Sequence, residues 1–166
     1  SDFGAEHPQM EELLNICDSW NVPVLIDMAY FGMCHDIEID LSHKCIEEVT
    51  FSLGKTFPII GARAGIRLQK REVDDAVLFA NQHGIVNNFG ALFGLTCIEN
   101  WDSDYIVRTC KDTQLQVCDS LGVEPSKCII FATSDKDEWE PLNRGNKTSR
   151  LCIAHDIEQQ YDKTDN

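Results

Sequence analysis

The segment that most restricts the possible folds of this chain is a short, almost entirely apolar run, Val-Pro-Val-Leu-Ile, at residues 22–26. Polar residues bound the run, with Asn21 before it and Asp27 after it. Runs of this kind are typical of strands buried on both faces, and such strands belong to parallel sheets that are covered by helices. The sequence therefore predicts a sheet whose first strand ends at Asp27.

A helix is expected immediately before this strand. Pro8 is a favourable residue for the start of a helix. The apolar residues that follow are spaced as on one face of a helix, and they are Met10, Leu13, Leu14 and Cys17. A helix followed by a buried strand that ends in a carboxylate is typical of α/β proteins, in which sites form at the carboxyl ends of strands.

The rest of the chain predicts further strands and helices. Strands are expected at residues 47–53, 62–68, 128–132 and 151–154. Helices are expected from about residue 71 to 84, from 85 to 100 and from 103 to 121, with a loop and a short helical turn at 28–44. We expect a partial large domain at residues 1–103, a small α+β domain at 104–166, and a frayed polar tail at 158–166.

The charge of the chain excludes several classes of partner. Its 14 Lys and Arg residues stand against 28 Asp and Glu residues, which gives a formal net charge of −14. With no basic cluster either, the chain has no electrostatic reason to bind nucleic acid or an anionic membrane. No apolar run approaches the roughly 20 residues of a membrane span, and the first residues do not resemble a signal peptide.

The eight cysteines include no C-x-x-C pair. Several lie in apolar patterns, where a reduced thiol packs as a small hydrophobic group, and these are Cys17, Cys97, Cys118, Cys128 and Cys152. We therefore expect mostly free thiols in a reducing compartment, which predicts a cytoplasmic protein.

Residues that could carry chemistry lie where the predicted strands begin or end. Asp27 ends the first strand and Tyr30 follows it, while Ser52 and Lys55 come at the end of the second and Arg63 lies near the start of the third. A lone lysine at a strand end is usually a solvated surface residue. Lys55, however, lies between apolar runs, where a charge is costly unless it is paired or used. A desolvated lysine near other cations is a nucleophilic amine suited to Schiff-base formation.

The order and spacing of these residues resemble the core of the fold-type I pyridoxal-phosphate (PLP) enzymes, specifically the class I/II aminotransferases. The shared motifs are Asp27-x-Ala29-Tyr30, Ser52-x-x-Lys55 and, eight residues after the lysine, Arg63. A lone S-x-x-K motif is a weak signal, but the three features in order form a specific combination. The similarity covers roughly residues 1–100 and is weaker beyond them.

The resemblance implies the C-terminal part of a PLP-dependent transferase-like large domain, with a mixed, mainly parallel sheet and helices, followed by a small α+β unit. It implies that Lys55 forms an aldimine, a Schiff base with the PLP aldehyde, and later shuttles a proton. Asp27 would pair with the pyridine nitrogen, and Tyr30 would hydrogen-bond the 3′-oxygen. Ser52 and Arg63 would hold the phosphate.

On a shorter motif, Arg150 resembles the family's arginine that binds the substrate α-carboxylate. The implied activity is transfer of an amino group between an α-amino acid and a 2-oxo acid, with β-elimination and decarboxylation left open. Each residue also has a structural interpretation. Asp27 could be a capping or loop carboxylate, Tyr30 a half-buried aromatic, Ser52 a polar strand residue, Arg63 a salt-bridge partner and Arg150 a surface strand residue.

The family's members are much longer than this chain, and the part that is absent here would precede Ser1. In the family that part supplies a Gly-rich phosphate cradle, an aromatic residue that stacks on the pyridine ring, and most of the sheet. We therefore expect weak or absent PLP binding and turnover by the isolated chain. We also expect it to form a homo-oligomer or to associate with a missing N-terminal half. The alternatives are a non-catalytic α/β oligomerisation or interaction module and an unrelated α/β binding domain.

Two other residue sets carry weaker signals. The cysteine and histidine pairs Cys34-His35 and His43-x-Cys45 are metal-ligand types, but their spacing fits no familiar zinc site, and we expect no metal. Glycines at 90 and 94 lie in a helical stripe and are expected to permit close helix packing rather than to bind a ligand.

Overall fold

The computed structural model describes residues 6–57, 59, 61, 63–145 and 147–164. The chain forms two compact units. The N-terminal unit comprises residues 6–30 and 38–103, and the C-terminal unit comprises residues 31–37 and the chain from residue 104 onward. The segment 31–37 thus leaves the N-terminal unit between two of its strands and packs with the C-terminal unit.

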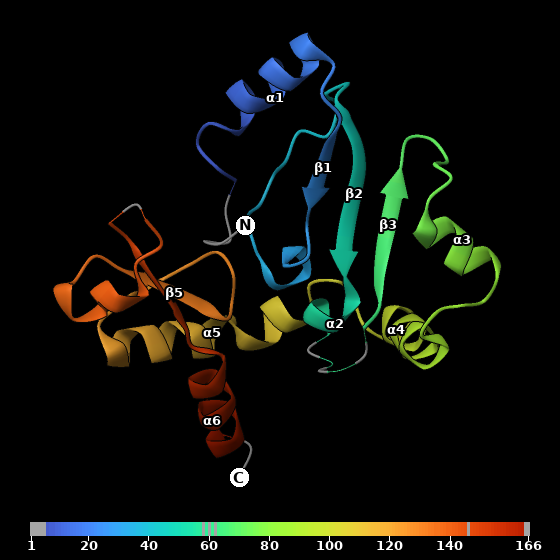
Figure 1. The fold of residues 1–166 in the computed structure, drawn as a ribbon. Coiled ribbons are helices and arrows are strands. Elements are labelled where there is room, and N and C mark those ends of the chain that lie inside the picture. Colours follow the sequence, from blue (N-terminus) through green and yellow to red (C-terminus); the bar gives the residue numbers. More distant parts are fainter. Residues whose placement is uncertain (1–5, 58, 60, 62, 146, 165–166) are drawn as a thin grey trace. The chain divides into compact units, whose positions relative to one another are not determined.

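The N-terminal unit contains a three-stranded mixed sheet, which Figure 1 shows with its strands side by side. Its strands are β1 (Val24–Asp27), β2 (Ile46–Ser52) and β3 (Gly65–Gln69), in that order across the sheet. β1 is parallel to β2, and β3 is antiparallel to β2. The predicted α/β fold with a mixed sheet is confirmed. The described strands contain one parallel pair where a mainly parallel sheet was expected.

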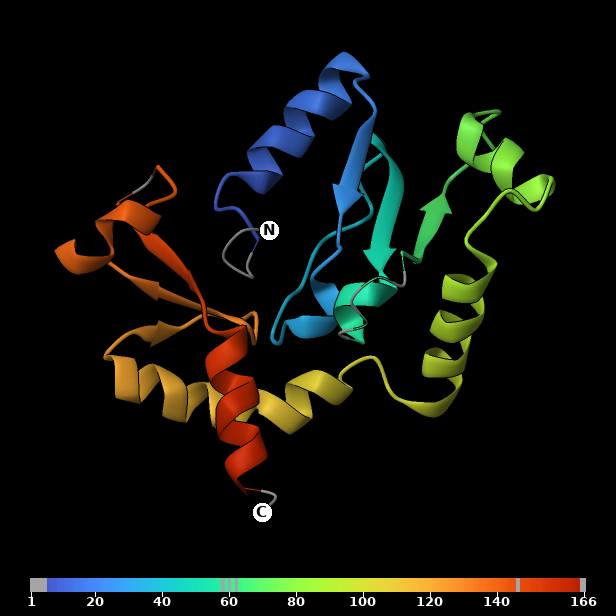
Figure 2. The ribbon, with the colours of Figure 1, turned by 60° about the horizontal axis from the view of Figure 1, so that its bottom comes forward.

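Helix α1 (Met10–Trp20) packs on this sheet, and Figure 2 shows it beside β1. Leu14 of α1 is buried with Ile26 of β1 and Val49 of β2 in the core of the unit. Asn21 ends the helix in the left-handed conformation, with φ 52°, and its N–H bonds the carbonyls of the last turn. The predicted helix and its end are confirmed.

The expectation that β1 is buried on both faces is wrong. Ile26 is 7% exposed, but its neighbour Leu25 is 53% exposed. Alternate residues of a strand point to opposite faces. The face that carries Ile26 is covered by α1, while the face that carries Leu25 is left open to solvent in the described chain. The apolar run therefore predicted the strand correctly but not the cover on its second face.

The remaining helices of this unit are α2 (Leu53–Thr56), α3 (Ala76–Gln82) and α4 (Asn88–Asn100). α3 begins later than expected because the Asp75 carboxylate caps it, accepting bonds from the N–H groups of Val77 and Leu78. Asp75 also accepts a 2.7 Å bond from Arg67 of β3, and that ion pair, with the cap, lowers the pKa of Asp75 to about 2. Asp75 therefore links the start of α3 to β3 through its ion pair with Arg67.

The C-terminal unit contains a three-stranded antiparallel sheet with helices. Its elements are η1 (Phe31–Met33), α5 (Tyr105–Leu121), β4 (Glu124–Pro125), β5 (Phe131–Ser134), η2 (Asp137–Leu142), β6 (Ser149–Cys152) and α6 (Ala154–Thr164). The sheet order is β4-β5-β6. Buried Val117 and Cys118 of α5 share a core with Leu151 of β6. Gly122 ends α5 with φ 63°, as the sequence predicts.

Two sequence expectations in this unit need correction. The predicted strand 128–132 begins at Phe131, because Ile129 and Ile130 form a turn that the N–H of Phe131 closes with a 3.0 Å bond to the carbonyl of Cys128. The side-chain amide of Gln114 donates to the carbonyls of Cys128 and Phe131 on either side of this turn. The tail expected to fray is helical as far as Thr164. Ile153 and Ile157 are buried four residues apart, so one face of α6 packs on the core.

All eight cysteines are free thiols. Cys97, Cys118 and Cys128 are buried as expected, whereas Cys152 is exposed because it lies on the solvent side of β6. Among the helices that the structure describes, none has the length and apolar character needed to cross a bilayer.

Candidate functional site

The largest group of predicted site residues lies around one cavity in the N-terminal unit. The cavity has a volume of about 640 Å³. It is lined by residues 50–52 at the end of β2, by Gly54 and Lys55 of α2, by residues 63–65 at the start of β3, and by Ala29, Ile59 and Gly61. Ser52, Lys55 and Arg63 therefore share a cavity.

The topology of the sheet explains why these residues meet. β2 passes directly into α2, so Ser52 and Lys55 are separated by less than one helical turn. β3 is antiparallel to β2, so the start of β3 lies beside the end of β2, and Ser52 pairs with Gly65. The N–H of Leu53 donates a 3.1 Å hydrogen bond to the carbonyl of Ala64. Arg63 is thereby held next to the β2–α2 junction.

Gly65 is a further residue of the cavity wall. A Cβ atom at this position would lie 2.5 Å from the carbonyl oxygen of Phe51, which is closer than real Cβ contacts occur. Only glycine lets β3 approach β2 at this point. The available signal was the run Ala62-Arg63-Ala64-Gly65, in which small residues surround the arginine.

Tyr30 contacts Lys55 directly. The Lys55 Nζ lies 3.8 Å from the centroid of the Tyr30 ring, which is a cation–π contact. Tyr30 follows β1 and Lys55 follows β2. Because β1 and β2 are parallel, both residues lie at the same end of the sheet. The ring of Tyr30 holds the ammonium group of Lys55 at a defined position.

Asp27 lies at this end of the sheet but outside the cavity wall. It is the last residue of β1 and pairs in register with Thr50, which lines the cavity. The Asp27 side chain is exposed, and its Oδ1 accepts a 2.9 Å hydrogen bond from the N–H of Ala29. In this conformation Asp27 stabilises the turn after β1. Neither Asp27 nor Tyr30 lines the cavity, whereas Ala29 between them does.

Arg150 belongs to the C-terminal unit. It lies in β6, is half-buried, and pairs in register with Thr133 of β5. Its guanidinium carbon lies 4.3 Å from the centroid of the Phe131 ring, which is a cation–π contact. That contact orients the guanidinium within its own unit.

The cysteine and histidine pairs considered as metal ligands fall in different units, with Cys34 in the C-terminal unit and His43 in the N-terminal unit. The Nδ1 of His43 lies 3.1 Å from Asp18 and its Nε2 lies 3.2 Å from Glu11. These hydrogen bonds, first to Asp18 and then to Glu11, raise the pKa of His43. Within the described part of the chain, no group of three or more potential ligands could hold a metal ion.

The glycine expectation for α4 is met at Gly94. A Cβ atom there would lie 2.7 Å from Cδ1 of Leu53 and 3.8 Å from Cβ of Ala64. α4 thus packs closely against the start of α2, the helix that carries Lys55.

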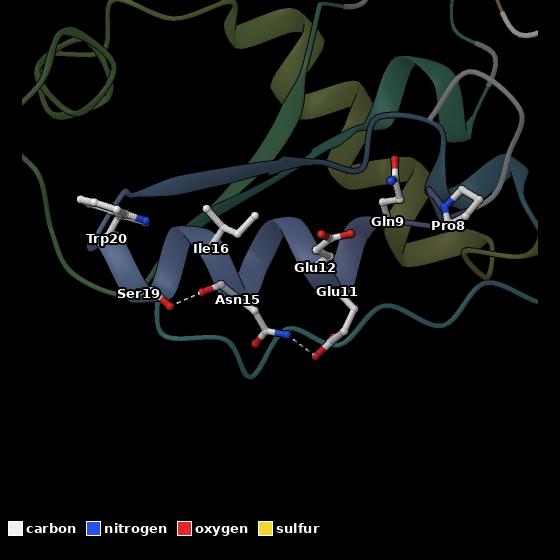
Figure 3. Close-up of a pocket in the computed structure, with 8 residues that line it drawn as sticks. All are labelled: Pro8, Gln9, Glu11, Glu12, Asn15, Ile16, Ser19 and Trp20. Atoms are coloured by element: carbon white, nitrogen blue, oxygen red, sulfur yellow. Dashed lines mark hydrogen bonds between the residues drawn. The ribbon is translucent and has the colours of Figure 1, made fainter.

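A second hollow, of about 570 Å³, lies along α1 (Figure 3). Its wall is formed by residues of the helix and of the turn before it, including Glu11, Glu12, Ile16 and Trp20. Figure 3 shows the polar groups bonding one another along the helix, with Asn15 donating to Glu11 at 3.2 Å. None of the predicted site residues lines this hollow.

The first cavity brings together a hydroxyl, a primary amine and a guanidinium, from Ser52, Lys55 and Arg63. A guanidinium and a hydroxyl can donate hydrogen bonds to a phosphate, and the lysine amine can bond covalently to an aldehyde. Residues 4–105 match the model of the family described as aminotransferase class I and II. The chain belongs to this family. The matched range contains Asp27, Tyr30, Ser52, Lys55 and Arg63 but not Arg150.

Solved aminotransferase structures share the fold of the chain. An aminotransferase from Staphylococcus aureus superposes with a TM-score of 0.57 and 15% identity, covering 93% of this chain and 52% of that one. A tyrosine aminotransferase from Leishmania infantum gives a TM-score of 0.56 and 13% identity, covering 95% of this chain and 51% of that one. The chain therefore spans about half the length of these two proteins. No curated protein sequence matches it.

Proposed function

We propose that the chain is the lysine-bearing part of a PLP-dependent aminotransferase, which transfers an amino group between an α-amino acid and a 2-oxo acid. The observation that carries this proposal is the shared cavity of Ser52, Lys55 and Arg63 in a chain of the aminotransferase family. These groups fit PLP, because the cofactor joins a phosphate to an aldehyde-bearing ring. When bound, PLP supplies an electron sink for the electrons left on the substrate α-carbon.

Three residues hold the cofactor in this proposal. The Arg63 guanidinium and the Ser52 hydroxyl would hold the phosphate, because both groups can donate hydrogen bonds to its oxygens. The Lys55 amine would hold the cofactor at its aldehyde, and it would act as the base that moves the proton of the substrate α-carbon. The contact with the Tyr30 ring supports this role, since it limits the positions open to the Lys55 Nζ.

Asp27 and Arg150 have less direct support. We assign the Asp27 Oδ2 to the protonated pyridine nitrogen, because Oδ1 already accepts the Ala29 N–H and a carboxylate accepts several hydrogen bonds. We assign Arg150 to the substrate α-carboxylate. Its support is the cation–π contact with Phe131, which limits the positions open to the guanidinium.

We propose that the cofactor site is completed by protein outside this chain, either a missing N-terminal half or a second copy. The chain spans about half the length of the two solved aminotransferases. The solvent-exposed face of β1 at Leu25 supports this proposal, because an apolar strand face of this kind is normally covered by other protein segments. The isolated chain is then expected to bind PLP weakly and to turn over slowly or not at all. The eight free thiols support a reducing, cytoplasmic setting.

A second candidate function is a non-catalytic oligomerisation or interaction module built on the same scaffold. It is favoured by large apolar side chains that are strongly exposed, with Trp20 at 77%, Phe89 at 76% and Leu92 at 66%. Both candidates predict association of the chain. They differ in whether Lys55 reacts with PLP.

Borohydride trapping separates the two candidates. The chain is incubated with excess PLP, reduced with borohydride, digested and mapped by mass spectrometry. Preferential labelling of Lys55 over the other lysines supports the cofactor site. Lys44, which is exposed in the same unit, provides the matched control: Lys44→Ala keeps the labelling and Lys55→Ala removes it. Labelling spread evenly over the lysines leaves the interaction module as the better account.

A further inference from the structure

Two cysteines face each other in the C-terminal unit. Cys34, which follows η1, forms an antiparallel bridge with Cys128. The N–H of His35 donates a 3.0 Å bond to the carbonyl of Lys127, and the N–H of Ile129 donates a 2.8 Å bond to the carbonyl of Met33. These bonds flank the two cysteines on either side, so the cysteines are a non-hydrogen-bonded antiparallel pair.

This kind of pair has the geometry that a disulfide needs. The Cα atoms of a non-hydrogen-bonded pair lie about 4.5 Å apart, with both side chains on the same face. A disulfide accepts Cα separations of about 4.4–6.8 Å. The two thiols already interact, because a hydrogen bond from the Cys34 thiol lowers the pKa of Cys128 and the same bond, with burial, raises the pKa of Cys34.

The backbone on both sides of the pair is held in place. The Lys127 Nζ donates a 2.6 Å hydrogen bond to the carbonyl of Asp36, and the side-chain amide of Gln114 donates a 3.1 Å bond to the carbonyl of Cys128. Formation of a sulfur–sulfur bond between Cys34 and Cys128 therefore requires rotation of their side chains and no movement of the backbone. Cys128 is fully buried, while Cys34 is half-buried and offers the route by which a reagent can enter.

We propose that Cys34 and Cys128 are a redox modification site that closes a reversible disulfide. The oxidant is a low-molecular-weight disulfide such as oxidised glutathione. Cys34, the more accessible thiol, passes its proton to the Cys128 sulfur that accepts its hydrogen bond, attacks one sulfur of the oxidant and expels the first glutathione thiolate. The Cys128 thiolate then attacks the Cys34 sulfur of this mixed disulfide and expels the second. The protein loses two protons and two electrons, and the small disulfide becomes two thiols.

This site is independent of the proposed function. The bond closes a long loop and fixes the segment 31–37, which follows Tyr30, to the turn before β5. A covalent bond there makes the packing of this segment with its unit resistant to local opening.

The test is disulfide mapping of the whole chain. The reduced protein is exposed to oxidised glutathione, alkylated, digested without reductant and analysed by mass spectrometry. We expect a linked peptide pair that contains Cys34 and Cys128, a loss of two of the eight titratable thiols, and recovery of both on adding dithiothreitol. The proposal is wrong if the folded chain forms other links, such as Cys17 with Cys45, or only mixed disulfides, while these two cysteines stay unlinked.

Variants separate pairing from general thiol reactivity. Cys34→Ser should leave Cys128 unoxidised, since Cys128 is buried and loses the partner through which it reacts. Cys152→Ser is the control, because Cys152 is an exposed thiol of the same unit and its removal should leave the Cys34–Cys128 link unchanged. Circular dichroism checks that each variant is folded, and the mapping of the unaltered chain does not depend on any variant.

Discussion

Gly65 gives the sharpest test of how the cavity is built. A methyl group at this position would lie 2.5 Å from the Phe51 carbonyl oxygen, so Gly65→Ala must push β3 away from β2 by nearly 1 Å to reach an ordinary contact. Overpacking of this kind costs about 1–3 kcal/mol. Against this, replacing glycine restricts the unfolded chain and returns about 0.4–1 kcal/mol. We therefore expect a net destabilisation of about 1–2 kcal/mol.

The assay is urea unfolding followed by circular dichroism, in which a loss of this size shifts the midpoint by roughly 0.5–1 M. Gly94→Ala is the matched control. Its new methyl group would meet the end of the flexible Leu53 side chain, 2.7 Å away, rather than backbone. That side chain can rotate, and alanine favours the helix by about 1 kcal/mol, so Gly94→Ala should be neutral or stabilising. Equal midpoints for the two variants would refute the reasoning about β3.

Three further predictions concern the phosphate, a buried amide and the response to pH. Arg63→Ala should weaken trapping of PLP by about 10- to 100-fold, the equivalent of about 1.5–3 kcal/mol. Trapping of pyridoxal, which lacks the phosphate, should not change. Equal losses for both compounds would contradict the assignment of Arg63 to the phosphate. Gln114→Leu should lower the free energy of unfolding, measured in urea, by about 2–3 kcal/mol, because the Gln114 side chain is 1% exposed and its amide donates to three carbonyls. A loss smaller than that for substituting an exposed glutamine would contradict this role. Hydrogen bonds from Cys45, and to a smaller extent from His43, lower the pKa of Asp18 from its ordinary value of 3.8. The Asp18 carboxylate therefore stabilises the fold above pH 3.8, and this stabilisation is lost as the pH falls through the folded pKa. The pKa of His43 is raised from 6.5, so its contribution is full below that value and is lost as pH rises through the folded pKa. The urea midpoint should therefore be highest at a pH between the folded pKa values of Asp18 and His43. His43→Gln should reduce the fall of this midpoint as the pH rises, and an unchanged fall would contradict the ion-pair network.

The sequence predicted features that depend on local chemistry. The helix that ends at Asn21 follows from apolar spacing and from a residue that tolerates the left-handed conformation. The approach of Arg63 to Lys55 follows from motif spacing once the strands are placed. A lysine and an arginine at such positions are informative because apolar runs surround them.

Other features depend on contacts between distant segments, which the sequence does not display. The antiparallel direction of β3 and the packing of segment 31–37 with the C-terminal unit are set by tertiary contacts. The Asp27 side chain satisfies a backbone N–H of its own turn, so its position could not be read from the strand end alone. α6 was missed because its composition is mostly polar, and its buried Ile157 pairs with Ile153, which precedes the helix.

The most direct test of the cofactor site is the fraction of trapped PLP carried by Lys55. At a PLP concentration that labels each chain once on average, the account predicts that Lys55 carries most of the label and that Lys55→Ala loses it without a gain elsewhere. A label distributed over the exposed lysines, and unchanged in total by Lys55→Ala, would contradict it.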